Sequence, residues 1–178
     1  MSEASAWILR HAGLVSPGAR VLDLAAGSGR HARLFAARGA AVVAIDRDAG
    51  ALGALAAVAG VEVRCADLEG PVWPLAGESF DAVIVSRYLH RPRFDDVLAL
   101  LAPAGTLLYE TFAVGNERFG RPTNPAFLLE PGELLERVHE RLVVVDFEQG
   151  AHGQPPTAVV QRLAAVGRAR VWPPSIGD

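Results

Sequence analysis

The sequence of 178 residues contains no lysine, so its 17 strongly basic side chains are all arginine. Without lysine, the chain cannot form a Schiff base with pyridoxal phosphate and cannot build an ordinary P-loop for a nucleoside triphosphate. The single cysteine, Cys65, excludes an internal disulfide and a metal cluster held by several thiolates. Because Cys65 lies in a predicted strand, we expect it to be a buried core residue.

Long apolar runs and a strong charge of either sign are also missing. No stretch reaches the ~18 to 20 apolar residues of a membrane span and no signal segment is evident, so we expect a cytoplasmic protein without a membrane partner. A formal charge of −3 with dispersed arginines lacks the basic surface of a nucleic-acid binder. We expect one domain over residues 1–178, with a poorly ordered tail after about residue 167. The oligomeric state stays open.

Residues 21–38 carry the clearest structural signal in the chain. The apolar run 21–24 leads into a turn that contains Gly27 and Gly29, and residues 31–38 then show an apolar face at helical spacing. This order predicts a strand, a tight turn and a helix. Glycine allows backbone angles closed to other residues and lets a ligand approach the main chain, beside the free amides of a helix start. The turn is therefore a candidate nucleotide cradle.

Two acids help to decide which nucleotide this turn would hold. Residues 27–32 fit the dinucleotide pattern G-x-G-x-x-G/A, which alone would indicate a nicotinamide or flavin enzyme. Asp23, however, lies inside the strand, where a carboxylate needs a polar partner and where a dinucleotide turn has no use for one. Asp46 ends the next apolar run, at the distance from Gly27 at which a strand-end acid meets a ribose.

Four motifs in order resemble those of class I S-adenosylmethionine-dependent methyltransferases. They are residues 21–29, 43–48, 61–68 and 79–86. The resemblance implies that S-adenosylmethionine is the cofactor, that Asp46 binds its ribose, and that Asp67 accepts a hydrogen bond from its adenine. Arg10, on an expected N-terminal helix, would reach the carboxylate of the cofactor. The expected cofactor-binding residues are therefore Arg10, Asp23, Ala25, Gly27, Gly29, Asp46, Arg47, Asp67, Leu68 and Ser86.

The alternation of apolar runs and helical segments implies an α/β fold with a doubly wound sheet. Strands are expected at residues 21–24, 41–46, 61–65, 80–86, 106–112, 142–148 and 158–165, and helices at 2–14, 31–38, 48–57, 95–101 and 133–141. The family resemblance implies a Rossmann-like sheet of seven strands in the order 3-2-1-4-5-7-6, with the seventh strand antiparallel.

Candidate catalytic residues follow the fourth and fifth strands, because ligands of an open α/β sheet bind beyond the carboxyl ends of its strands. His90 could act as a general base, because a free imidazole titrates near physiological pH, or it could begin a helix or face solvent. Tyr88 either lines the pocket or packs. An amine or hydroxyl acceptor would need more help from His90 or Glu110. No ligand cluster among the five histidines suggests a metal, so none is expected.

A long, polar loop over residues 110–125 follows the fifth strand, and loops of this length are usually functional or disordered. With residues 127–134 it resembles a segment of small tellurite-resistance-type methyltransferases. We expect Phe112, Phe119 and Phe127 to anchor it. Its arginines either clamp a small anion or pair with nearby acids, and a purely structural lid is equally open. The residues concerned are Arg118, Arg121, Glu110 and Glu117.

The resemblance implies methyl transfer from S-adenosylmethionine to a small-molecule acceptor, with a soft nucleophile or an anionic compound as candidates. The protein would mainly align the reacting atoms and exclude water. Two alternatives remain at this point. One is a catalytically silent cofactor-binding protein that scaffolds or regulates a partner, and the other is a nicotinamide-dependent oxidoreductase, favoured only by the glycine pattern.

Overall fold

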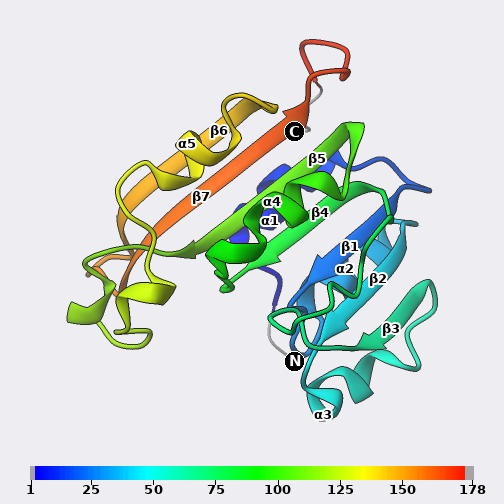
Figure 1. The fold of residues 1–178 in the computed structure, drawn as a ribbon, viewed down its shortest axis with the longest axis horizontal. Helices are drawn as coiled ribbons and strands as arrows, with labels where there is room; N and C mark the ends of the chain where they lie inside the picture. The colour runs from blue at the N-terminus through cyan, green and yellow to red at the C-terminus, as the bar shows by residue number, and fades with distance from the viewer. Residues whose placement is uncertain (1–2, 175–178) are drawn as a thin grey trace.

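A seven-stranded sheet forms the centre of the computed structural model, which describes residues 3–174 (Figure 1). The order β3-β2-β1-β4-β5-β7-β6 agrees with the prediction. Strands β1 to β5 pair in parallel and β7 runs antiparallel to both of its neighbours, which is also as predicted. The strands are β1 Arg20–Leu24, β2 Ala41–Asp46, β3 Val61–Cys65, β4 Phe80–Ser86, β5 Leu101–Phe112, β6 Leu142–His152 and β7 Ala158–Gly167.

Helices cover both faces of the sheet, as the near-continuous apolar sequence of β4 requires. Alternation along β1 directs Val21 to one face and Leu22 to the other, and each side chain joins a separate core cluster. Helices α4 and α5 cover the near face in Figure 1, and α1, α2 and α3 belong to the opposite layer. The helices are α1 Ala6–His11, α2 Arg30–Ala37, α3 Ala49–Leu52, α4 Phe94–Ala99 and α5 Glu133–Val138.

Several helices are shorter than the sequence predicts, and short 3-10 turns take up part of the difference. Asp48 caps α3 by accepting a hydrogen bond from the Ala51 amide at 3.0 Å, but the glycine-rich sequence turns into a 3-10 segment at Gly53. Strand β5 begins at Leu101, ahead of the expected start, through an irregular pairing with β4. The 3-10 turns are η1 Ala12–Leu14, η2 Gly53–Leu55, η3 Arg91–Arg93, η4 Asn116–Arg118 and η5 Pro125–Phe127.

The expected burial of Cys65 is wrong. Strand β3 lies at the edge of the sheet, where it pairs only with β2. Its side chains are therefore partly or fully exposed, and Cys65 is exposed, with its thiol 3.6 Å from the Arg47 carbonyl oxygen. The continuous apolar sequence of a central strand is absent here, because apolar and charged residues alternate along residues 61–65.

Residues near both ends of the described chain are fixed to the rest of the fold. Trp7 is buried, which agrees with the view that it covers the core. Arg168 donates to the carbonyl oxygens of His139 and Glu140, and Arg170 donates to that of Leu14, so the first residues of the predicted tail are fixed. Residues 175–178 of that tail lie outside the described part. Within residues 3–174, no helix combines the length and apolarity needed to cross a membrane.

Candidate active site

The turn between β1 and α2 uses its two glycines for different purposes. Both have positive φ, +54° at Gly27 and +74° at Gly29. A Cβ atom on Gly29 would lie 2.2 Å from a Leu55 methyl carbon, so packing requires glycine there. A Cβ atom on Gly27 would meet nothing within 4 Å. The main chain at Gly27 therefore faces open space, as a ligand cradle requires.

Asp23 has the polar partner that its place inside a strand demands. It is 2% exposed, and its Oδ2 atom accepts a hydrogen bond from the Ala32 amide, in the first turn of α2, at 2.8 Å. Burial raises the pKa of Asp23 to about 7, although the Ala32 hydrogen bond opposes this shift. The carboxyl group thus joins β1 to the start of the helix beside the turn.

Asp46 fixes the glycine turn from the neighbouring strand. Its Oδ2 atom accepts a hydrogen bond from the Gly27 amide at 2.8 Å, and its Oδ1 atom accepts one from Asp48 at 2.9 Å. The parallel register of β1 and β2 places the ends of both strands at one edge of the sheet. The acid predicted at the end of β2 therefore lies beside the turn.

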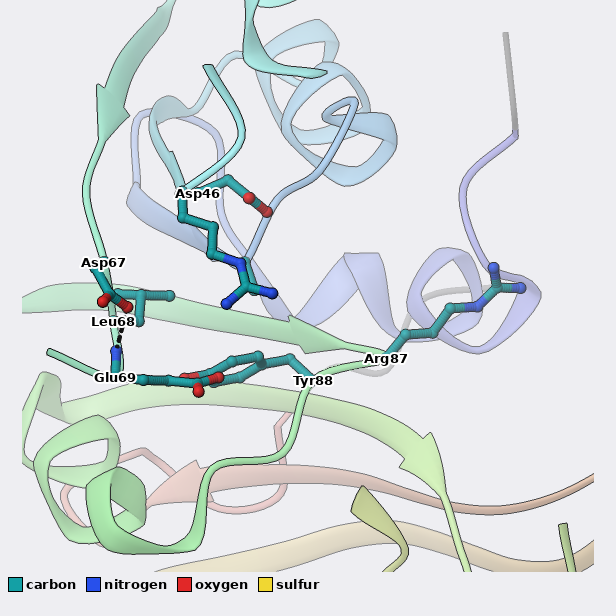
Figure 2. Close-up of a pocket in the computed structure, with 8 residues that line it drawn as sticks. Asp46, Asp67, Leu68, Glu69, Arg87 and Tyr88 are labelled. Atoms are coloured by element: carbon teal, nitrogen blue, oxygen red, sulfur yellow. Dashed lines mark hydrogen bonds between the residues drawn. The ribbon is translucent and has the colours of Figure 1, made fainter. Parts of the chain in front are cut away.

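A cavity of about 260 Å³, here called the first cavity, opens beyond the ends of β1, β2 and β3 (Figure 2). Asp46, the last residue of β2, and Asp67, in the loop after β3, face it, and Asp67 accepts a hydrogen bond from the Glu69 amide at 2.9 Å. Five of the predicted cofactor residues therefore lie together. The first cavity is lined by Ala25, Asp46, Arg47, Asp67, Leu68, Glu69, Arg87 and Tyr88.

Tyr88 belongs to the first cavity. Its ring extends toward Leu68 and Glu69 (Figure 2), and its buried hydroxyl has no hydrogen-bond partner among residues 3–174. Burial raises the pKa of this hydroxyl, and the nearby carboxylates of Glu69 and Asp67 raise it further. Tyr88 therefore stays protonated, as a hydrogen-bond donor beside the predicted cofactor residues.

A larger cavity of about 530 Å³, here called the second cavity, lies at the carboxyl end of β5 and the start of β7. The register of these antiparallel strands places Glu110 directly opposite Arg162. Apolar side chains, among them Phe112 and Val160, line part of the wall. The polar side chains at this cavity are those of Ser5, Arg30, Arg87, Glu110, Thr111, Arg121, His152, Thr157 and Arg162.

Glu110 is the centre of a polar network at the second cavity. Its Oε2 atom accepts a hydrogen bond from the Ser5 hydroxyl at 2.7 Å, and its Oε1 atom accepts one from the Ser86 hydroxyl at 2.9 Å. The guanidinium groups of Arg30 and Arg162 lie 3.7 and 3.6 Å from its carboxylate. The side chain is 8% exposed, so this network holds Glu110 in one position.

A third cavity of about 350 Å³ extends along the glycine turn and includes Gly27, Ser86 and Arg87 in its lining. Arg87 lines all three cavities. Its φ of 57° is uncommon for a residue with a Cβ atom, and the side chain points away from Tyr88 toward the N-terminal segment (Figure 2). The three cavities therefore meet at Arg87.

His31 shows that the junction of the cavities at Arg87 is shielded from solvent and positively charged. Burial lowers the pKa of His31 to about 3, and the charges of Arg30 and Arg87 lower it further. The imidazole is neutral at physiological pH, and its Nε2 atom accepts a hydrogen bond from the Ser5 amide at 3.3 Å. His31 therefore joins the N-terminal segment to α2 without adding charge.

The structure places two predicted site residues elsewhere. Arg10 is exposed and donates a hydrogen bond to Glu148 on β6 at 2.8 Å, and it lines none of the three cavities. His90 lies 3.8 Å from the Glu69 carboxylate and also lines none of them. Neither side chain lies with the other predicted site residues.

The loop after β5 is anchored differently from the prediction. Phe119 and Phe127 are 42% and 45% exposed, so the expectation that they anchor it is wrong. Asn116 is 1% exposed instead; its amide donates to the Pro122 carbonyl oxygen and accepts from the Val159 amide. A polar side chain anchors this loop, because its main-chain groups need partners that a phenyl ring cannot supply.

An ion-pair cluster fixes the end of the same loop. Arg91 donates to the carbonyl oxygens of Ala126 and Leu128 and to the Glu133 carboxylate at 2.7 Å. Burial alone would raise the pKa of Glu133, but hydrogen bonds from Arg91, the Glu130 amide and Arg137 lower it to about 2. The segment after β5 is thus tied to α5 and to the loop after β4.

The sequence did not reveal three arginines of the second cavity. Arg30 and Arg87 adjoin recognised motifs, but no motif assigns them a role. Arg162 meets Glu110 only through the register of β5 and β7, which a local pattern does not contain. A basic residue directly after a motif strand was the available signal for Arg87.

Known proteins share both the motif region and the fold. Residues 21–108 match a family model described as a methyltransferase domain. A demethylmenaquinone methyltransferase of Mycobacterium sp. (strain KMS) is 32% identical over 173 residues, which are 92% of this chain and 65% of that relative. The chain thus spans slightly less than two thirds of the relative's length.

Solved structures show the same fold at lower sequence identity. TehB from Haemophilus influenzae superposes with a TM-score of 0.77 at 16% identity, over 94% of this chain and 64% of that chain. The 1,6-didemethyltoxoflavin-N1-methyltransferase of Burkholderia thailandensis, solved with 1,6-didemethyltoxoflavin and S-adenosylhomocysteine bound, gives a TM-score of 0.66 at 23% identity, over 91% and 76% of the two chains. Its four motifs, its strand order and the matched methyltransferase domain make the chain similar to the class I S-adenosylmethionine-dependent methyltransferases.

Proposed function

We propose that this protein transfers a methyl group from S-adenosylmethionine to a small-molecule acceptor. The observation that carries the proposal is the meeting of a motif-lined cavity and a separate, larger cavity at Arg87. The first cavity and the glycine turn would hold the cofactor, and the second cavity would hold the acceptor. A reaction between two bound molecules needs such adjoining sites at one edge of the sheet.

The residues of the first cavity fit the cofactor. Gly27 leaves its main chain open to a ligand, and Asp46 and Asp67 present carboxylate oxygens that hydroxyl and amino groups can bind. We assign Asp46 to the ribose and Asp67 to the adenine, with Arg47 and Leu68 beside the ring. When bound, the cofactor supplies an electrophilic methyl group on a sulfonium ion.

The other cofactor residues would act around the glycine turn. Asp23 and Gly29 hold the turn in shape through Ala32 and Leu55, and the Ser86 hydroxyl joins the third cavity to Glu110. The backbone of Ala25 lies at the first and third cavities. Arg10 is not part of this assignment, because its side chain pairs with Glu148 on β6.

The second cavity supports an enzyme over a silent scaffold. The sign of a scaffold would be a cofactor site without room for an acceptor, and the second cavity offers about 530 Å³, within the range of small-molecule sites. The residues around it would position the acceptor and exclude water. We assign Glu110 a positioning role, since both of its oxygens already accept hydrogen bonds and two arginines lie beside them.

Calorimetric titration of the purified protein with S-adenosylmethionine, S-adenosylhomocysteine and NAD tests the proposal. We expect the first two ligands to bind with micromolar affinity and NAD not to bind. The Asp46→Asn variant should weaken cofactor binding by about tenfold or more, which corresponds to about 1.4 kcal/mol. Asp81→Asn is the matched control, since Asp81 pairs with the Arg20 amide at the start of β1 and lines none of the three cavities. Binding of NAD alone would overturn the proposal.

A further inference from the structure

The second cavity concentrates positive charge in a protein whose net charge is negative. Four of the chain's 17 arginines, Arg30, Arg87, Arg121 and Arg162, line this one cavity, whereas the chain carries a formal charge of −3. Among residues 3–174, Glu110 is the one carboxylate in its lining, and Glu148 lies 3.3 Å from Arg162 outside the lining. The four cations still outnumber these two carboxylates, which leaves a positive potential that a concave site focuses.

The internal partner, Glu110, neutralises only part of this charge. It lies 3.7 Å from Arg30 and 3.6 Å from Arg162, and its remaining hydrogen bonds come from serine hydroxyls. Among residues 3–174, no hydrogen bond or ion pair involves the guanidinium groups of Arg87 or Arg121. Two arginines at this cavity are therefore free to bind a ligand.

Arg162 adds a donor that makes no hydrogen bond. Its side chain is 14% exposed, and its buried Nε atom lies 3.6 Å from Glu110 Oε2, too far for a hydrogen bond, with no other acceptor among the described residues. The Nη1 atom is already engaged, at 3.3 Å from both Glu148 and His152. A buried donor without a partner is costly, and a ligand oxygen at this place would remove that cost.

The walls of the second cavity define the rest of the ligand. Phe112, Ala158 and Val160 contribute apolar surface, and Thr111 and Thr157 contribute hydroxyl groups. An acceptor that fits this lining has an apolar body and one anionic end. Arginine favours such a group because its planar guanidinium donates two parallel hydrogen bonds to a carboxylate or phosphate.

We propose that the methyl acceptor is an anionic small molecule whose carboxylate or phosphate-like group is bound by Arg121 and Arg162, with Arg87 at the junction with the cofactor. This inference rests on the proposed function, since it names the substrate class of the same site. It makes the second cavity an oxyanion-binding site, and the anionic group sets the orientation of the acceptor.

The test uses three probes of similar shape and different charge: benzoate, phenylphosphonate and benzamide. Each is titrated calorimetrically into the full-length protein, once saturated with S-adenosylhomocysteine and once alone. We expect at least one anion to bind about tenfold or more tightly than benzamide, and we expect this preference to decrease as salt screens the arginines. A comparison of the two anions shows whether a planar or a tetrahedral group is preferred.

Variants identify the residues responsible. Arg121→Gln should remove most of the preference for the anion and leave S-adenosylhomocysteine binding unchanged. Arg121 has no side-chain partner among residues 3–174 whose loss would disturb folding. Arg162→Gln should have the same effect on the preference. Arg118→Gln is the matched control, because Arg118 lies in the same loop, donates to the Gly115 carbonyl oxygen and does not line the second cavity.

Three results would overturn the inference. They are equal binding of benzamide and both anions, no binding of either anion, and an equal loss of preference in Arg118→Gln and Arg121→Gln. Failure of the proposed function is a different result, in which S-adenosylhomocysteine does not bind the unmodified protein. The titrations without it still measure the charge preference of the cavity.

Discussion

The first and second cavities are built in opposite ways. The first takes Asp46 from the last position of β2 and Asp67 from the loop after β3, and each of these acids belongs to a short motif. The second takes its arginines from four separate parts of the chain, at positions 30, 87, 121 and 162, and has no motif. A cavity made of local motifs is expected to keep its ligand within a family, whereas one assembled from distant residues can change with few substitutions.

The largest loss of stability should come from a substitution in the glycine turn beside the first cavity. In Gly29→Ala, the new Cβ atom would overlap the Leu55 side chain in a left-handed backbone, and we expect a loss of up to about 5 kcal/mol of unfolding free energy. Gly27→Ala is the control, because its Cβ atom would meet nothing within 4 Å. Gly27→Ala should lose about 1 to 2 kcal/mol and mainly weaken cofactor binding. If urea unfolding shows that Gly29→Ala and Gly27→Ala lose the same unfolding free energy, packing does not require glycine at position 29 more than at position 27.

Asp23, beside the glycine turn, should lower the unfolding free energy of the protein as the pH rises. Its pKa is raised from 3.8 to about 7 in the folded protein, so folding favours the protonated form. Its contribution to stability is present below pH 4 and is lost as the pH rises toward 7, by on the order of 4 kcal/mol. Urea unfolding from pH 4 to 8 should show that Asp23→Asn lacks this part of the slope. An identical slope in both proteins would refute the assignment.

Glu133, which fixes the end of the loop after β5, should give the opposite dependence of unfolding free energy on pH. Its pKa is lowered from 4.5 to about 2, so its contribution is present above pH 4.5 and is lost as the pH falls toward 2. We expect Glu133→Gln to lower the unfolding free energy at pH 7 by about 3 kcal/mol and to remove this acid-sensitive part. The exposed Glu136 on the same helix provides the control variant, Glu136→Gln. If both variants lose the same stability at pH 7, the Arg91–Glu133 cluster is not what holds the loop.

The smallest effect is expected at His90. This residue was a candidate general base, but it lines none of the three cavities and lies beside the Glu69 carboxylate. His90→Gln should change the turnover rate by less than about twofold, compared with the 10²-fold or greater loss that removal of a general base brings. Transfer of a tritiated methyl group to the acceptor measures this rate. A loss of two orders of magnitude would restore His90 as a catalytic residue.

The residues around the first cavity could be predicted because the information is local. The order of motifs, the glycine turn, the acid that ends β2 and the acid after β3 follow from short patterns, and the apolar runs predicted all seven strands. The strand order itself came from the family resemblance. Residues such as Asp46 then reach their places through the parallel register alone.

The acceptor side could not be predicted in the same way. Arg162 meets Glu110 through the antiparallel register of β5 and β7, and the buried Asn116 binds Val159 from a distant part of the chain. The burial predicted for Cys65 and Phe119 is also wrong, because Cys65 lies on an edge strand and Phe119 faces solvent. Such contacts depend on the tertiary structure, which overrides residue type.

A crystal structure of the protein with S-adenosylhomocysteine would show which cavity holds the cofactor. We expect the adenosine in the first cavity beside Asp46 and Asp67, the amino-acid part along the glycine turn, and the sulfur atom directed toward Arg87 and the second cavity. A sulfur atom directed away from the second cavity, or a ligand bound outside the first cavity, would contradict the claim that one cavity holds the cofactor and the other the acceptor.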